Sequence, residues 1–199
     1  MKKVNNLQVY KKCLIVVDMV NGFVREGILH DKEIETIIKR GKEIIDEYIN
    51  ANELVVFIKD THTKESTEFI RFGNTNHCLK GSSESQLVNE YKEYENMDNV
   101  VSIEKNSTSF MEAPNFRKLI KKLKNIETID VFGCCTDICV ANGTIGLSNY
   151  LNEWNKDVEI KVHEDAIETY GAEFHNREEY TKAAKLLMQQ QGIQLVKKR

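Results

Sequence analysis

The sequence predicts an α/β protein of three layers, with an open, mainly parallel sheet of six strands and helices on both of its faces. Short apolar runs alternate along the chain with longer stretches of helical periodicity, which is the pattern of strands and helices around a parallel sheet. The 199 residues can bury one sizeable core, and neither a repeat nor a linker-like composition divides them. We therefore expect a single domain over residues 1–199.

The individual elements follow from the same two patterns. The six apolar runs that predict strands cover residues 13–18, 53–60, 100–105, 128–134, 158–165 and 193–196. The stretches that place apolar residues at near-helical spacing cover 31–49, 115–124, 136–150 and 177–191. Pro114, the only proline, stands where the first turn of a helix tolerates it. The stretch 61–84 has neither period and is long for a plain loop, which predicts a functional segment.

Composition and charge argue against a nucleic-acid or membrane partner. The 28 basic and 31 acidic residues are interspersed and give a net charge of -3. The first apolar run breaks at Asp18 after about six residues, which is too short for a signal-peptide core or a membrane span. We therefore expect a cytoplasmic protein with a small-molecule partner, and a homo-oligomer remains open. In a reducing compartment the five cysteines are core thiols, metal ligands or a nucleophile rather than disulfides.

Polar and thiol side chains follow five of the predicted strands. Ligands of an open parallel sheet bind beyond the carboxyl ends of its strands, so the residues there form a shortlist for a site. The shortlist contains Asp18, Asp60, Lys105, the cysteine cluster at 134–139 and Asp165. We expect all of them to converge on one edge of the sheet.

The cysteine cluster "GCCTDIC" spans residues 133–139 and joins a predicted strand to a predicted helix. Cys139 falls in the first turn of that helix, with Thr136 or Asp137 as the N-cap. The positive end of the helix dipole lowers the pKa of a thiol there and favours a nucleophilic thiolate. A small buried hydrophobe is the alternative for this cysteine. Cys134 and Cys135 are expected to serve packing, and a zinc site within the cluster is not favoured because no second Cys or His pair stands nearby at ligand spacing.

A nucleophile needs a base and a group that holds charge. Asp18 follows the run "LIVV", where partial desolvation raises the pKa of a carboxyl group toward a useful value. Lys105 ends another predicted strand and can keep the carboxylate and the thiolate paired. Each of the two alone fits an ordinary strand-end charge, but together with Cys139 they indicate a catalytic site.

The irregular stretch carries two histidines and two carboxylates in "KDTHTKESTEF" and the following "NHC". Asp60 and His62 are two residues apart, so both side chains face the same way on an extended segment, and Glu68 and His77 can complete the set. Such a donor set suits zinc, iron or manganese. A polar surface loop is the alternative, because an Asp two residues from a His is common by chance.

Together these residues resemble the nicotinamidase and isochorismatase superfamily of cysteine hydrolases, from residue 14 to about residue 191. The stretches that carry the resemblance are "LIVVDMVNGF", "KDTHTKESTEF" with "NHCLKG", "EKNSTSF" and "GCCTDICV", in the order of the family. The resemblance implies an isochorismatase-like, Rossmann-like hydrolase fold. It also implies one divalent metal, zinc before iron or manganese, as in the nicotinamidase branch.

The resemblance also assigns roles to residues. The implied catalytic triad is Asp18, Lys105 and Cys139, and the implied metal ligands are Asp60, His62, Glu68 and His77. The backbone N–H groups of Cys135 and Cys139 are implied to form an oxyanion hole. The peptide bond between Cys134 and Cys135 is implied to be cis.

The activity implied is hydrolysis of a small amide, foremost nicotinamide in NAD salvage, through a thioester on Cys139. Phe23 matches a family position that lines the ring pocket. The chain departs from the family three residues before His77, where an aromatic residue is common and Asn74 stands. Either Phe72 replaces that wall or Asn74 itself lines the pocket.

Three alternatives to a nicotinamidase stay open. The first is another small-amide hydrolase of the superfamily, such as one that acts on an N-carbamoyl compound. The second is an isochorismatase-type hydrolase, and the third is a non-catalytic binding or redox-sensing module that uses the clustered thiols. The last two are not favoured because the triad and the metal set are both intact in the sequence.

Overall fold

The computed structural model describes residues 7–198 and places all its strands in one sheet. The strands are β1 (Lys12–Val17), β2 (Leu54–Asp60), β3 (Val100–Lys105), β4 (Thr128–Cys134), β5 (Glu159–Glu168) and β6 (Gln194–Val196). Neighbours pair in parallel in the order β3-β2-β1-β4-β5-β6, which confirms the predicted open parallel sheet. The order reverses between β1 and β4, and such a switch point is where doubly wound sheets bind ligands.

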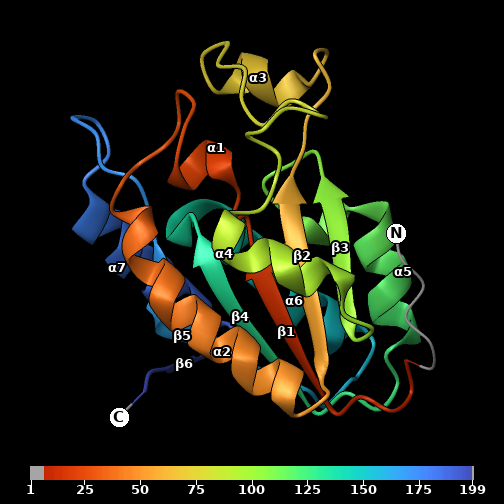
Figure 1. Cartoon of the computed structure of the whole chain (residues 1–199). Helices are drawn as coiled ribbons and strands as arrows, with labels where there is room; N and C mark the ends of the chain where they lie inside the picture. The colour runs from red at the N-terminus through yellow and green to blue at the C-terminus, as the bar shows by residue number, and fades with distance from the viewer. Residues whose placement is uncertain (1–6, 199) are drawn as a thin grey trace.

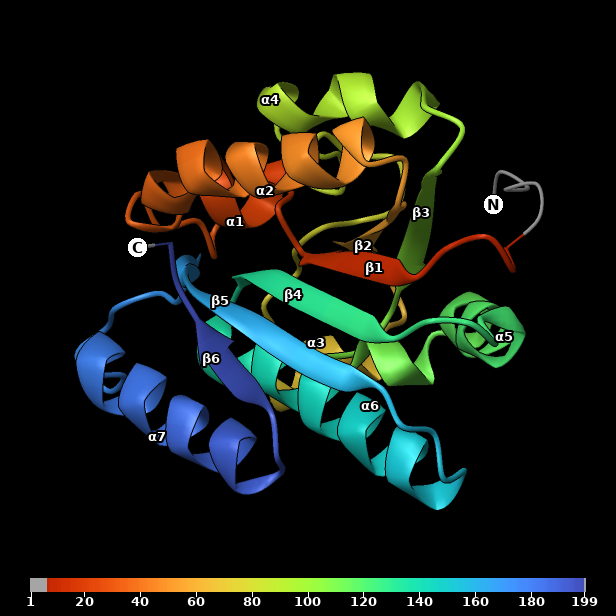
Figure 2. The same cartoon turned by 90° about the horizontal axis from the view of Figure 1, so that it is seen from below.

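Helices cover both faces of the sheet and complete the three predicted layers (Figure 1). The α-helices are α1 (Asn21–Val24), α2 (Ile38–Asn50), α3 (Thr67–Arg71), α4 (Asn89–Lys92), α5 (Pro114–Lys122), α6 (Ala141–Glu153) and α7 (Arg177–Gln190). Shorter helical turns are η1 (Ile34–Ile37), η2 (Glu93–Asn96), η3 (Phe110–Glu112) and the π-helical η4 (Thr136–Val140). Figure 2 shows α2 and α4 on one face and α5, α6 and α7 on the other.

The sheet is the centre of the core. The residues of β1 from Leu14 to Val17 are fully buried, as a strand covered on both faces requires. Gly133 lets β4 approach β1 at the switch point, because a Cβ there would lie 2.0 Å from the carbonyl oxygen of Val17. Its φ of +128° also favours glycine. Pro114 begins α5, which confirms its place in a first helical turn. Within residues 7–198, every helix is too short or too polar to cross a bilayer.

Three sequence-based expectations need correction or restriction. The fifth strand does not end at Asp165 but continues to Glu168, because Ala166 and Ile167 remain buried. Asp165 therefore lies inside β5 and binds Arg40, 2.9 Å from its Nε, instead of joining a site at the sheet edge. The helix expected over 31–49 begins only with η1 and α2. The first six residues of the predicted N-terminal segment, and Arg199, lie outside the described residues.

Candidate active site

Three charged or thiol side chains meet at the carboxyl ends of the central strands. Asp18 directly follows β1, Lys105 ends β3, and Cys139 lies in η4 after β4. The Nζ atom of Lys105 lies 2.9 Å from Asp18 Oδ2 and 3.6 Å from Cys139 Sγ. The same ammonium is 2.6 Å from Oδ1 of Asp60, its partner in the β2–β3 register. The structure thus places the other two residues of the implied triad, Asp18 and Cys139, around the ammonium of Lys105.

Asp18 is a buried carboxylate with a raised proton affinity. Its side chain is fully enclosed, and burial raises its pKa to about 6 although the charge of Lys105 opposes the shift. The backbone holds it in place, since its N–H donates to the carbonyl of Ile58 at 3.0 Å and its carbonyl accepts from Cys134 Sγ at 3.2 Å. A carboxylate of this kind can accept a proton near neutral pH.

Cys139 differs from the sequence-based expectation in its protonation. Burial raises the pKa of the thiol well above its usual value, and the nearby charge of Lys105 only partly offsets this. The expected lowering by a helix dipole is therefore wrong for the free protein, because desolvation outweighs it. The expected N-cap is also wrong: neither Thr136 nor Asp137 caps the turn, whose N-cap position is Cys135. Cys139 enters a reaction as a thiol that needs a base.

The peptide bond between Cys134 and Cys135 is cis, as the resemblance implies. Cys134 is fully buried, and burial raises the pKa of its thiol well above the usual value. Cys135 and Cys139 both line the cavity described below, whereas Cys134 lies in the hydrophobic core and outside the lining. Two of the three clustered cysteines therefore face the cavity, and the third is a core residue.

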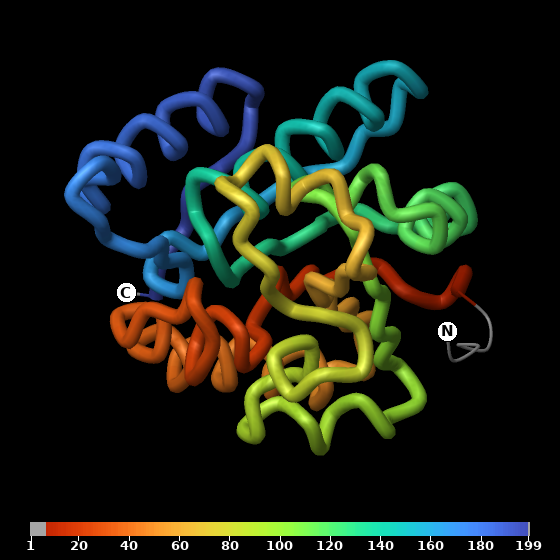
Figure 3. Tube along the Cα trace, turned by 90° about the horizontal axis from the view of Figure 1, so that it is seen from above, coloured from red at the N-terminus to blue at the C-terminus, as the bar shows by residue number. Residues whose placement is uncertain are grey.

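The four donors of the irregular segment also come together. Asp60, His62, Glu68 and His77 offer ligand atoms that all lie within 4.8 Å of one another. Oδ2 of Asp60 is 2.8 Å from Nε2 of His62 and 3.2 Å from Nε2 of His77, and Oε1 of Glu68 is 3.7 Å from Nε2 of His62. Figures 1 and 3 show this segment, with α3, arching over the carboxyl ends of the strands.

The second nitrogen of each histidine is held by a partner outside the cluster. Nδ1 of His62 lies 2.8 Å from Oδ1 of Asn106, and Nδ1 of His77 lies 2.9 Å from the carbonyl of Thr75. Both Nε2 atoms therefore face the cluster in a fixed orientation, which is how metal-binding histidines are held. Two imidazoles and two carboxylates fit a divalent transition metal. Burial opposes ionisation of Asp60, but Lys105 and both histidines hold its pKa well below the usual range.

A cavity of about 530 Å³ connects the cluster to the nucleophile. Its lining includes Cys139 and three of the four donors, Asp60, Glu68 and His77. Phe23 and Phe72 also line it, whereas Asn74 is exposed and lies outside the lining. The positive φ of Asn74, 61°, places it in a turn, where its N–H donates to the carbonyl of Phe69 at 2.6 Å.

Sequence reasoning missed Tyr170 and Asn106. Tyr170 lines the cavity together with neighbouring residues of the connection between β5 and α7. It follows a strand end, so the same rule that found Asp18 would have found it had β5 been extended to Glu168. Asn106 follows β3, but only the structure shows that it orients His62.

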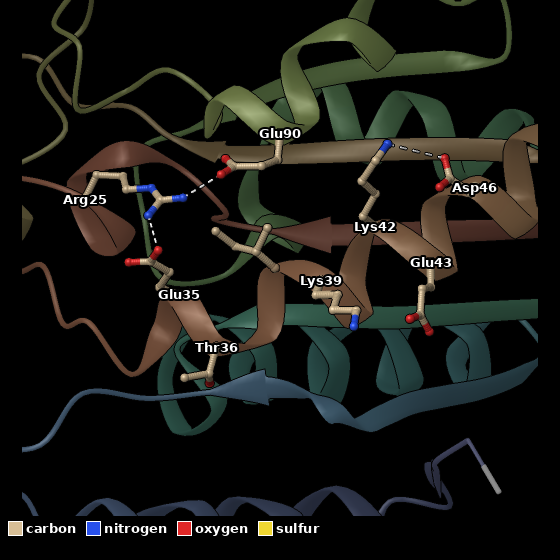
Figure 4. A pocket seen from close by; sticks show the side chains of 9 residues that line it. Arg25, Glu35, Thr36, Lys39, Lys42, Glu43, Asp46 and Glu90 are labelled. Atoms are coloured by element: carbon tan, nitrogen blue, oxygen red, sulfur yellow. Dashed lines mark hydrogen bonds and ion pairs between the residues drawn. The ribbon is translucent and has the colours of Figure 1, made fainter.

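A second hollow, of about 430 Å³, lies between α2 and α4 and contains no comparable cluster (Figure 4). Arg25 in this hollow pairs with Glu35 and Glu90, and Lys42 pairs with Asp46. None of the residues that line it offers a nucleophilic thiol or a histidine. Most of its charged side chains are held in ion pairs, so we assign the chemistry to the first cavity.

Comparison with known proteins places this site in a family. The family model described as the Isochorismatase domain matches residues 12–193. Nicotinamidase 1 of Arabidopsis thaliana is 29% identical over 139 residues, which cover 64% of this chain and 56% of that protein. The match therefore spans little more than half the length of that relative.

Two solved structures share the fold over nearly the whole chain. A nicotinamidase from Bacillus subtilis has a TM-score of 0.70 and 26% identity, with 94% of this chain and 99% of the other covered. An N-carbamoylsarcosine amidase from Thermoplasma acidophilum has a TM-score of 0.72 and 23% identity, with 94% and 96% covered. Because proteins with two different substrates share this fold, the fold alone does not select the substrate.

Proposed function

Since the chain belongs to the Isochorismatase family, we propose that it is a cysteine amidohydrolase that converts nicotinamide to nicotinate and ammonia. The observation that carries the proposal is the single cavity onto which Cys139 and three members of the donor cluster, Asp60, Glu68 and His77, open together. This arrangement supports a substrate whose amide carbonyl meets the thiol while its ring reaches the cluster. The likeness to a curated nicotinamidase supports the same substrate.

The first half of the reaction forms a thioester. Asp18 takes the proton of the Cys139 thiol, and the sulfur attacks the amide carbonyl carbon. Lys105, 3.6 Å from the sulfur, stabilises the negative charge as the proton leaves. The backbone N–H groups of Cys135 and Cys139 receive the developing oxyanion, where such a donor typically contributes about 2.7–4 kcal/mol. Asp18 then passes its proton to the nitrogen, and ammonia departs as the C–N bond breaks.

The second half regenerates the enzyme. Asp18 takes a proton from a water molecule, and the resulting hydroxide attacks the thioester carbonyl. As the C–S bond breaks, Asp18 returns its proton to the sulfur, and the carboxylic acid loses its own proton to solvent and leaves as its anion. Lys105 stays charged throughout, because the carboxylates of Asp18 and Asp60 hold its pKa well above the usual value despite burial.

The donor cluster fits one divalent metal, for which zinc is our first choice and iron or manganese the alternatives. Asp60, His62, Glu68 and His77 would hold it, and a bound metal would supply a Lewis acid for the pyridine nitrogen. Phe23 and Phe72 would flank the substrate ring. We further propose that the whole chain acts as one domain, in the cytoplasm and in NAD salvage, with the five free thiols in a reducing compartment.

The test is ammonia release by the purified protein from a panel of amides that includes nicotinamide, pyrazinamide and an N-carbamoyl amino acid. Nicotinamide should give the highest kcat/KM, and Cys139→Ser should abolish the activity. A hydrolase for N-carbamoyl compounds is the second candidate, because Asn74 stands where the nicotinamidase branch commonly has an aromatic wall. A preference for the carbamoyl substrate in this panel would replace the nicotinamidase assignment.

A further inference from the structure

The cavity extends beyond the groups that the proposed reaction uses, and its outer part is apolar. Five lining residues that take no part in that reaction carry apolar side chains: Ile28, Leu29, Ile138, Ala172 and Phe174. The volume of about 530 Å³ lies within the range of pockets that hold drug-sized ligands, roughly 300–1,000 Å³. Nicotinamide is a single ring with one amide group, so it leaves this outer part unfilled.

Two of these side chains are unusually exposed. Ile28 and Phe174 are 73% and 81% exposed, the two highest values among the large apolar side chains of residues 7–198. Single exposed apolar side chains are ordinary on a protein surface, but apolar groups gathered at the opening of a cavity indicate a ligand. Ile28, Leu29 and Phe174 therefore form an apolar rim at the mouth of the active-site cavity.

The rim is built from two connections that are far apart in the sequence. Ile28 and Leu29 lie between α1 and η1, and Phe174 lies between β5 and α7. Figures 1 and 3 show these two connections next to each other, above the carboxyl ends of the strands. A substrate that projects from the cavity would contact both.

Asp31 ties the two connections together. Its Oδ2 accepts hydrogen bonds from the backbone N–H of Gly171 at 2.9 Å and from Nη2 of Arg177 at 2.6 Å. Nε of Arg177 donates to the carbonyl of Thr169 at 2.8 Å, and the N–H of Asp31 donates to the carbonyl of Phe23 at 3.0 Å. The rim is thus held in place in the free protein, so a ligand gains its contacts with little cost for ordering them.

The polar side chains beside the rim are bonded within the same connections. The carboxylate of Asp31 is engaged by Gly171 and Arg177, and Nδ1 of His30 lies 2.9 Å from the carbonyl of Gly27. These contacts leave the apolar side chains as the main binding surface at the mouth.

We propose that the enzyme prefers nicotinamides that carry an apolar substituent over nicotinamide itself, and that Ile28, Leu29 and Phe174 select them by covering the substituent. The proposal rests on the proposed function and narrows its substrate class. The amide carbonyl lies at Cys139 and the ring nitrogen faces the donor cluster, so the substituent leaves the ring on the side away from both. Each CH2 group that is fully removed from water improves binding on the order of fourfold.

Ammonia release from three matched amides tests the preference. They are nicotinamide, 5-propylnicotinamide and 5-(methoxymethyl)nicotinamide, the last with an ether oxygen in place of one CH2 of the propyl chain. Because the rim stays partly open to solvent, kcat/KM for the propyl compound should exceed that for nicotinamide roughly tenfold, mainly through a lower KM. The methoxymethyl compound should stay close to nicotinamide. Equal values for the two substituted amides, or a lower value for the propyl compound than for nicotinamide, would overturn the proposal.

Variants of the rim test the residues. Ile28→Ser and Phe174→Ser should each lower the ratio of kcat/KM for the propyl compound to that for nicotinamide several-fold. Ile70→Ser is the matched control, since Ile70 is 70% exposed on α3 and lies outside the cavity lining, and it should keep the wild-type ratio. A wild-type ratio in both rim variants, or the same fall in Ile70→Ser, would contradict the proposal. If a second copy of the chain covers the rim instead, Ile28→Ser changes the sedimentation of the protein but not the ratio, which also overturns it.

Calorimetry with the zinc-loaded Cys139→Ala variant separates this proposal from the proposed function. The propyl compound should bind roughly tenfold more tightly than nicotinamide without any turnover. Binding with this preference, but no ammonia release by the wild type, would refute the proposed function alone. Binding of both amides with equal affinity would refute the selection by the rim alone, and absence of binding would refute both.

Discussion

Asp18→Asn should remove the activity and make the protein more stable. Burial raises the pKa of Asp18 from 3.8 to about 6, so the folded state disfavours the ionised form. The contribution of protonated Asp18 to the free energy of unfolding is fully present below about pH 3.8. It is lost as the pH rises through about 6. The difference between a pKa of 3.8 and one of about 6 lowers the free energy of unfolding at pH 7 by about 3 kcal/mol, since a tenfold change in an equilibrium constant corresponds to 1.36 kcal/mol. Asparagine cannot ionise and keeps this stability.

Thermal unfolding and ammonia release on the same samples give the two readouts. At pH 7 the variant should gain up to about 3 kcal/mol, or roughly 6–12 °C in Tm for a chain of this size, and the gain should vanish near pH 4. The wild-type kcat/KM should rise about tenfold per pH unit up to about pH 6, where the base becomes ionised.

Asp165→Asn is the control with the opposite sign. Although burial opposes it, the backbone N–H of Lys198 and the side chain of Arg40 hold the pKa of Asp165 below its usual value. This substitution should therefore lower stability at pH 7 and leave the activity intact. A less stable Asp18→Asn protein at pH 7, or an equal gain at pH 7 and pH 4, would refute the reasoning.

The remaining predictions concern the thiol, the donor cluster and the cavity wall. Cys139→Ala should abolish ammonia release, whereas Cys134→Ala should retain much of it, since of these two sulfurs only that of Cys139 contacts Lys105. Equal loss of activity in two folded variants would contradict the assignment. Chelation of the metal, or His62→Ala, should reduce nicotinamide turnover. The change in Tm should be much smaller, because most of the cluster lies in the segment that arches over the strands and not in the sheet. Full activity of the metal-free protein would refute the proposed ligand set. Phe72→Ala should raise KM for nicotinamide several-fold, since stacking contributes roughly 0.5–1.5 kcal/mol, while Asn74→Phe should have little effect. The reverse pattern would place Asn74 in the pocket.

The sheet and the convergence at its edge could be predicted because both depend on local sequence signals. A strand buried on both faces must be apolar along its length, so "LIVV" predicts β1, and the aspartate after it must lie at the strand end. The parallel direction of neighbouring strands then brings Asp18 and Lys105 to the same edge. No tertiary knowledge beyond the direction of the strands is needed for this step.

The depth of burial could not be predicted in the same way. The helix-dipole argument predicts a lowered pKa for Cys139, but the structure encloses this residue, which is 7% exposed, and desolvation outweighs the dipole. The charged residues "HED" in the fifth strand caused a second error, because the strand was predicted to end with them. They look like a strand end, yet they are half-buried residues in the middle of β5, and Tyr170 beyond them was missed. Exposure of a side chain depends on which segments cover it, and a single local stretch does not contain that information.

Asp60 belongs both to the group around Lys105 and to the donor cluster, and the sequence alone does not reveal this double role. One of its oxygens, Oδ1, lies 2.6 Å from the ammonium of Lys105, and the other, Oδ2, faces the histidines of the donor cluster at 2.8 and 3.2 Å. The same carboxylate therefore fixes the cation that serves the thiol and orients the imidazoles that would hold a metal. Asp60 thus contacts both the ammonium of Lys105 and the histidines of the cluster. The distance between Lys105 and the cluster is then set by the pairing of β2 and β3, whose last residues are Asp60 and Lys105.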